Sequence, residues 1–115
     1  ENVADLFSSL HPAVLKAMRQ IVDGAAVSGT PVSVCGELAG DPIGVMALLG
    51  LGIDSLSMSV GSLLRAKKVI LSFSRSELTV LLEQALVMSE AKQIRDLYAS
   101  KLDERGLGGF LRAGR

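Results

Sequence analysis

The chain has 115 residues, of which 49% are hydrophobic, and its mean hydropathy is positive at +0.42. Such a composition is typical of a chain that buries a large core, and it excludes a disordered segment. The 12 basic residues equal the 12 acidic residues, and no basic cluster alternates with aromatic side chains, so we expect no nucleic-acid partner.

The single cysteine and the single histidine exclude two further classes of protein. One thiol cannot form an intrachain disulfide framework, and one thiol with one histidine is too few for a zinc site of the usual kind. The longest apolar stretch, residues 45–53, is too short for a membrane span of roughly 20 residues. We therefore expect a reduced, cytoplasmic setting with no membrane segment and no signal peptide.

The first predicted element is a helix over residues 11–26. Its apolar residues recur at spacings of three and four, which places them on one buried face. Gly29 follows as a helix end. The predicted face consists of Val14, Leu15, Met18, Ile21, Val22 and Ala25.

The only cysteine follows a short β-branched run over residues 31–34. This run predicts a buried strand, and Gly36 allows a sharp turn after it. Asp41 before Pro42 is typical of a helix start, with a carboxylate cap ahead of a proline. Cys35 is therefore predicted to be the last residue of the strand, at the mouth of a sheet, where α/β enzymes keep reactive groups.

A second strand and two more helices are predicted next. The pattern indicates a helix over residues 42–49, a strand over 55–59 and a helix over 62–73. This alternation is typical of parallel βαβ units, so the predicted fold class is α/β. Parallel sheets are normally covered on both faces, so something else must complete a sheet of two such strands.

The last third of the chain is predicted to be helical. Ser74 and Glu77 have the spacing of a capping box and open one amphipathic helix. Ser89 is expected to cap another helix, which ends at Gly106. The apolar faces of the two helices comprise Leu78, Leu81, Leu82, Ala85 and Leu86, and then Ile94, Leu97, Tyr98 and Leu102.

A glycine-rich tail over residues 106–115 closes the chain. We expect this tail to be flexible, although Phe110 and Leu111 could dock on a partner surface. The sequence shows no internal repeat. The expected organisation is a strand-and-helix part over residues 1–73, further helices of the same domain over 74–105, and the tail.

Four motifs agree in order and spacing with a known family. They are His11-Pro12-Ala13-Val14-Leu15, Val34-Cys35-Gly36-Glu37-Leu38-Ala39-Gly40-Asp41, Leu48-Leu49-Gly50-Leu51-Gly52-Ile53-Asp54 and Leu56-Ser57-Met58-Ser59. Through them, residues 3–72 resemble the phosphoenolpyruvate-utilising enzymes and, among these, the phosphoenolpyruvate–protein phosphotransferases, or enzyme I. The ending, residues 106–110, is more similar to the nitrogen-related branch than to the sugar-uptake branch.

The resemblance implies the C-terminal portion of a (β/α)8 TIM-type barrel, of which this chain supplies about the last two parallel strands and their helices. In the family, phosphoenolpyruvate (PEP) and Mg²⁺ bind at the carboxyl ends of the strands. The phosphoryl group passes to a histidine on an N-terminal domain and then to a phosphocarrier protein, and pyruvate is released. The magnesium ligands, the substrate-clamping arginines and the phosphorylated histidine match no position of this chain, since His11 belongs to the helix-start motif.

The chain begins at Glu1 without a methionine or a targeting signal. The Asn-Asp signature of the family should lie just upstream, so we expect a fragment of a longer protein. Alone, the fragment should be inactive. The resemblance also implies a homodimer formed through the barrel domain.

By resemblance, one catalytic residue carries across. Cys35 would be the proton donor, which protonates the methylene carbon of the enolate as pyruvate forms, and a neutral thiol holds the proton that this step consumes. Gly36 and Gly40 would keep the backbone close to the ligand. Glu37 could orient Cys35 or a neighbouring loop through hydrogen bonds.

These residues also have purely structural interpretations. Free cysteine is among the most buried residue types, and the four methionines are expected to fill the core. Glu37 is most simply a hydrogen-bond partner, Asp41 an N-cap and His11 a surface or capping residue. We expect Arg65, Lys67 and Lys68 to lie on a solvated helix face, although their side chains could also reach an anion.

Two other functions stay open. A pyruvate phosphate dikinase or a PEP synthase of the same superfamily would keep the barrel and the cysteine but change the phosphoryl acceptor, and the upstream domain would decide. A non-catalytic module is the other alternative. In it, half a barrel forms an obligate dimer that buries its sheet edges against a second copy.

Overall fold

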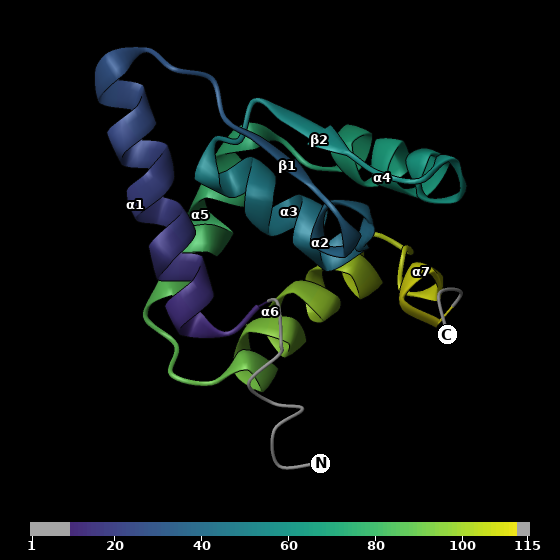
Figure 1. Cartoon of the computed structure of the whole chain (residues 1–115). Helices are drawn as coiled ribbons and strands as arrows, with labels where there is room; N and C mark the ends of the chain where they lie inside the picture. Colours follow the sequence, from purple (N-terminus) through teal and green to yellow (C-terminus); the bar gives the residue numbers. More distant parts are fainter. Residues whose placement is uncertain (1–9, 113–115) are drawn as a thin grey trace, which may run out of the picture.

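The structure, a computed structural model, describes residues 10–112 and is mostly helical (Figure 1). None of the helices in this range combines the length and the apolar character that a bilayer crossing requires. In chain order the elements are α1 (Pro12–Ser28), β1 (Ser33–Cys35), α2 (Glu37–Gly40), α3 (Pro42–Leu51), β2 (Ser55–Ser57), α4 (Val60–Ser72), α5 (Arg75–Leu86), α6 (Ala91–Glu104) and α7 (Gly109–Arg112).

The two strands form a parallel pair, as the sequence predicts. Val34 lies opposite Leu56, and Cys35 lies opposite Ser57. Parallel strands need a crossover connection, which α2 and α3 provide. The predicted α/β class with parallel strands is confirmed, although β2 ends at Ser57 and not at residue 59.

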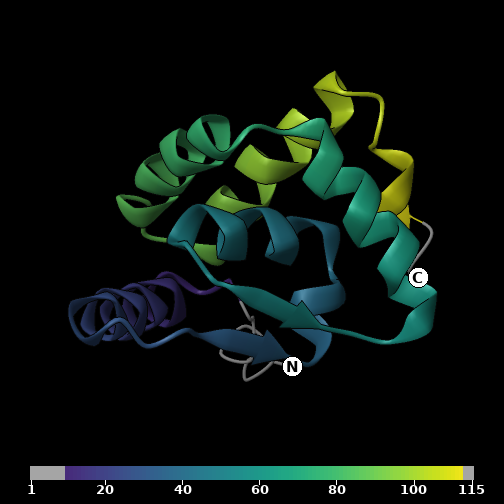
Figure 2. The same ribbon diagram turned by 90° about the horizontal axis from the view of Figure 1, so that it is seen from above.

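Helix α3 forms the centre of the core. Residues 42–48 are all buried, because the helix is apolar around its whole circumference and not on one face only. It lies between the strand pair on one side and α5 and α6 on the other (Figure 2). The helix continues past its predicted end at residue 49 to Leu51, where Gly52 follows with φ 92°.

Two glycines of α3 let neighbouring backbones approach closely. A Cβ atom on Gly44 would overlap the carbonyl oxygen of Leu38 in α2. A Cβ atom on Gly50 would lie 2.6 Å from the carbonyl oxygen of Leu78 in α5. Neither position has room for a side chain, so α2 and α5 rest directly against α3.

Helix α1 meets the core along a narrow side only. Leu15 is buried, whereas Val14 and Ile21 are 39% and 61% exposed. The predicted buried face is therefore wrong at these two positions, because α1 packs mainly against α3 and α5. Gly29 closes the helix in the left-handed conformation, as predicted, with φ 68°.

The C-terminal helices begin close to their predicted starts. In α5 the capping box is present, because the Ser74 hydroxyl accepts from the backbone N–H of Glu77 at 3.1 Å and the Glu77 carboxylate accepts from that of Ser74. In α6 the cap is Glu90 and not Ser89 as predicted. Here the Gln93 side chain accepts hydrogen bonds from the backbone N–H groups of both residues.

The glycine-rich ending is packed in the part that the structure describes. Leu107 is 7% exposed, and its backbone N–H donates to a carbonyl at the end of α6 at 2.8 Å. Helix α7 then holds Phe110 and Leu111 half-buried against the core. This packing differs from the flexible tail expected from the sequence, since the apolar residues between the glycines find a surface to cover. Residues 113–115 lie outside the described residues.

Candidate active site

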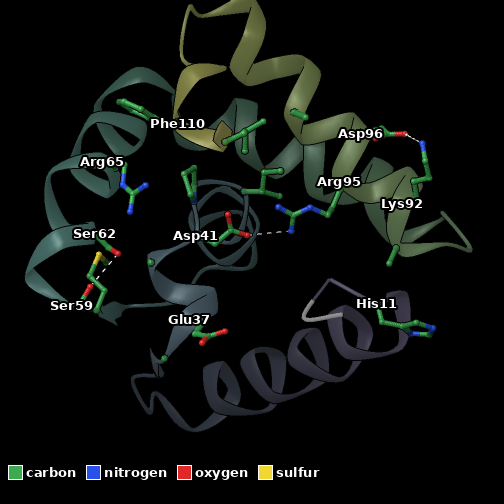
Figure 3. A pocket seen from close by; sticks show the side chains of 18 of the residues that line it. His11, Glu37, Asp41, Ser59, Ser62, Arg65, Lys92, Arg95, Asp96 and Phe110 are labelled. Carbon is green, nitrogen blue, oxygen red and sulfur yellow. Dashed lines mark hydrogen bonds and ion pairs between the residues drawn. The ribbon is translucent and has the colours of Figure 1, made fainter. Parts of the chain in front are cut away.

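A cleft of about 1370 Å³ opens at the carboxyl ends of the two strands (Figure 3). Helices α2, α4, α6 and α7 all contribute to its walls, so segments far apart in the sequence meet there. Besides the thiol of Cys35, its polar and charged lining includes Glu37, Asp41, Ser59, Ser62, Arg65 and Arg95.

Cys35 is the last residue of β1, as predicted, and its thiol is free. The side chain is exposed, which corrects the expectation of a buried strand. Of the three strand residues only Val34 is half-buried, because a sheet of two strands leaves one face uncovered. The thiol is therefore accessible from the cleft.

Gly36 turns the chain immediately after the thiol. Its φ of 108° is a conformation that residues with a side chain rarely adopt. The turn leads into α2, a helix of four residues that the sequence analysis does not predict. So short a helix, preceded by a glycine cap, carries neither an apolar periodicity nor a capping side chain that would reveal it.

Glu37 and His11 lie at the margin of the cleft, where Figure 3 labels both. Glu37 is exposed in the first turn of α2, and its carboxylate makes no hydrogen bond with any of the described residues. Its expected role in orienting Cys35 stays a prediction. His11 caps α1, because its Nδ1 atom accepts from the backbone N–H of Ala13 at 3.1 Å. The capping interpretation of His11 is thus confirmed.

Asp41 occupies the N-cap position of α3, as predicted, but its side chain does not cap the helix. The carboxylate instead accepts a hydrogen bond from Nη1 of Arg95 in α6 at 3.3 Å (Figure 3). Arg95 is a residue of the cleft that was not predicted from the sequence. Its partner lies 54 residues away, and no local pattern distinguishes it from other charged residues on the polar face of α6.

The opposite wall of the cleft carries two hydroxyls and a guanidinium. Ser59 donates a hydrogen bond from its hydroxyl to that of Ser62 at 3.2 Å. The Arg65 side chain points into the cleft (Figure 3) and forms no ion pair with any of the described residues. Lys67 and Lys68 are exposed and do not line the cleft, so the solvated face expected for all three holds for the two lysines only.

The described part of the chain does not assemble a metal site. Between residues 10 and 112, no group of three or more histidine, cysteine, aspartate or glutamate side chains comes close enough to hold an ion. The methionines fill the core as predicted. Met46 is fully buried, and the other three are partly buried and pack against the core. The cleft thus brings together the free thiol of Cys35, two ion pairs, Asp41–Arg95 and Lys92–Asp96, and the guanidinium of Arg65.

Comparison with known proteins places these features in a family. Residues 1–75 match the model of the PEP-utilising enzyme, PEP-binding domain. This stretch ends at the start of α5, so it holds both strands, the crossover and the thiol.

Curated relatives extend the similarity over most of the chain. A protein of Escherichia coli (strain K12) named "Phosphoenolpyruvate-dependent phosphotransferase system" is 38% identical over 98% of the chain and 15% of its own length. A "Phosphoenolpyruvate-protein phosphotransferase" of Staphylococcus carnosus is 36% identical over 84% of the chain and 17% of its length. A protein of the same name from Haemophilus influenzae is 36% identical over 93% of the chain and 19% of its own length. The chain thus spans less than a fifth of the length of each of these relatives.

Proposed function

Because the chain belongs to the family of PEP-utilising enzymes, we propose that it is the C-terminal part of a PEP–protein phosphotransferase. The whole protein would pass the phosphoryl group of PEP to one of its own histidines and on to a phosphocarrier protein, releasing pyruvate. The accessible Cys35 thiol at the carboxyl end of β1 carries this proposal. The chain alone, which lacks the phosphorylated histidine, would be inactive.

The proposed parent holds these strands in a (β/α)8 barrel. The parallel pair and its helical crossover support this architecture. A further support is the cleft at the carboxyl ends of the strands, where barrel enzymes place their active sites. Further strands from the parent would cover the exposed face of the sheet.

Cys35 is the proposed general acid. Loss of the phosphoryl group leaves enolpyruvate, whose methylene carbon must gain one proton to become the methyl group of pyruvate. The S–H bond of Cys35 breaks as the new C–H bond forms, and the resulting thiolate takes up a proton from water. Since Gly36 has no side chain, the ligand can approach the backbone next to the thiol.

One cationic side chain of the cleft, Arg65, suits a substrate with a carboxylate and a phosphate. Arg65 points into the cleft with no carboxylate partner among the described residues. A guanidinium binds such oxyanions through two parallel hydrogen bonds. This side chain would add to the arginines that the remainder of the parent supplies.

The proposal also includes Mg²⁺, a homodimer and a cytoplasmic location. The described residues gather no set of magnesium ligands, and the resemblance implies that earlier strands of the parent would hold the ion. The glycine-rich ending supports the nitrogen-related branch.

The test compares pyruvate formation by the intact parent protein with that of Cys35→Ala, in the presence of PEP, Mg²⁺ and the phosphocarrier. We expect a loss of about 100-fold or more in turnover, the scale of a missing general acid. Ser33→Ala is the matched control, because Ser33 is an exposed residue of the same strand outside the cleft. Unchanged turnover in Cys35→Ala would refute the role of the thiol. Transfer to an acceptor other than a protein would favour the dikinase or synthase alternative.

A further inference from the structure

Asp41 joins the segment after the thiol to the core. Its backbone N–H donates to the carbonyls of Glu37 at 3.0 Å and Leu38 at 3.3 Å, which closes α2. Its own carbonyl accepts from the N–H of Val45 at 2.8 Å, which opens α3. A displacement of the Asp41 side chain would therefore affect both α2 and α3.

The Asp41 side chain is used for a tertiary contact and not for capping. It is 27% exposed and pairs with Arg95, whose side chain is 47% exposed (Figure 3). Arg95 lies beyond residues 1–75, the stretch that matches the family domain. This pair thus ties a helix from outside the matched domain to the thiol-bearing segment.

The position of the Cys35 thiol depends on the position of α2, because the two are close neighbours in the chain. Only Gly36, with φ 108°, stands between Cys35 and the first residue of α2. Ala39 is the one buried residue of the helix, and α2 packs against α3, α4 and the two strands. The ion pair supplies the restraint toward α6, so its loss would let α2 shift and carry Cys35 with it.

We propose that Arg95 is a positioning residue for Cys35, and that it acts through Asp41 by fixing α2 at the margin of the cleft. This inference rests on the proposed function, in which Cys35 donates a proton. Small displacements of a proton donor slow the chemical step far more than they weaken substrate binding, since a 1 Å misplacement costs on the order of 100-fold. A half-exposed pair adds little to stability, so the effect should appear in catalysis and not in folding.

The experiment measures kcat and KM for pyruvate formation by the intact parent protein in five variants: Arg95→Ala, Arg95→Lys, Asp41→Asn, the Arg95→Ala/Asp41→Asn double variant, and Cys35→Ala. We expect Arg95→Ala and Asp41→Asn each to lower kcat about tenfold with KM changed less than about twofold. The double variant should be no slower than either single variant, because both remove one contact. Arg95→Lys should recover most of the kcat, since a lysine keeps the charge.

The matched control is Arg19→Ala. Arg19 pairs with Glu83 at 3.1 Å between α1 and α5, outside the cleft, so kcat should stay unchanged. An unchanged kcat in Arg95→Ala, or an equal loss in Arg19→Ala, would overturn the inference while leaving the proposed function standing. An unchanged kcat in Cys35→Ala would instead refute the proton-donor role of the thiol, the part of the proposed function on which this inference rests. If Arg95→Ala fails to fold by circular dichroism, kcat in Arg95→Lys and Asp41→Asn decides.

Discussion

At the scale of single residues, Tyr98 stands out in the core. It is fully buried in α6, and its hydroxyl has no hydrogen-bond partner among the described residues. Removal from water disfavours the charged form, which raises the pKa of the Tyr98 phenol well above its usual range. The folded state therefore holds this side chain neutral where the unfolded chain would ionise it.

This difference sets an alkaline limit on stability. Below the usual tyrosine pKa of about 10 the phenol is neutral in both states, and above it only the unfolded state gains from ionisation, by about 1.4 kcal/mol per pH unit. We expect the free energy of unfolding to fall above about pH 10. In Tyr98→Phe, the part of this decrease that comes from the phenol should be absent. Urea titrations of the unchanged chain and of Tyr98→Phe at a series of pH values measure the free energy of unfolding.

Tyrosinate absorbance provides the check on this expectation. Tyr98 is the only tyrosine of the chain, so its absorbance reports this side chain alone. It should appear together with unfolding. Ionisation of the phenol in a chain that is still folded would contradict the argument.

Residues with a local signal are predictable, and residues defined by tertiary contacts are not. Cys35 at a strand end, Gly36 at a turn and Asp41 at a helix start each follow from their immediate neighbours. The partner of Asp41 does not, because Arg95 meets it only once α6 packs beside α3. The exposure of the thiol likewise depends on the number of strands in the sheet, which no local pattern encodes.

At the scale of elements, the contact of α2 with α3 depends on an absent side chain. Gly44→Ala would force a methyl group into the Leu38 carbonyl, so we expect a loss of about 1–3 kcal/mol in the free energy of unfolding. Gly24→Ala in α1 is the matched control, because a Cβ there meets nothing within 4 Å. It should stabilise the chain by about 0.5–1 kcal/mol through the higher helix propensity of alanine.

Denaturant unfolding of the two variants and of the unchanged chain tests these two expectations, a lower free energy of unfolding for Gly44→Ala and a higher one for Gly24→Ala. A neutral or stabilising Gly44→Ala would show that α2 moves away from α3 without cost. That result would also weaken the argument that α2 is held firmly enough to position the thiol.

Helix ends follow from the sequence better than helix environments do. Gly29, Pro42 and the Ser74–Glu77 box mark their boundaries through backbone geometry and hydrogen bonds that involve a few adjacent residues. The exposure of Val14 and Ile21 depends instead on which neighbours surround α1. Periodicity predicts that a helix has an apolar face but does not say how much of it this chain covers.

At the scale of the whole molecule, a large apolar surface stays uncovered. Many exposed apolar side chains of the described residues belong to α4, and a barrel would bury such side chains beneath further elements. They are Val60 at 87%, Leu63 at 46%, Leu64 at 78%, Ile70 at 40% and Leu71 at 82% exposed. Among the described residues, β1 and β2 pair only with each other, so each strand has an outer edge without a partner strand.

We therefore expect the isolated chain to self-associate. Leu64→Lys combined with Leu71→Lys places two charges on one side of α4 and should shift the population toward the monomer. Val87→Lys is the control, because Val87 is 85% exposed but lies at the end of α5. Light scattering over a concentration series measures the mass. A monomer at every concentration would argue against both the prediction and the dimerising-module alternative.

The uniformly apolar surface of α3 has a consequence during synthesis. A ribosome releases α3 before α5 and α6, the helices that cover one of its sides, have been made. In that interval a helix with no polar face is open to chaperones and to other nascent chains. Slow translation of residues 52–74, which separate α3 from α5, would lengthen the exposure, so codon choice in this short stretch should influence the yield of folded protein.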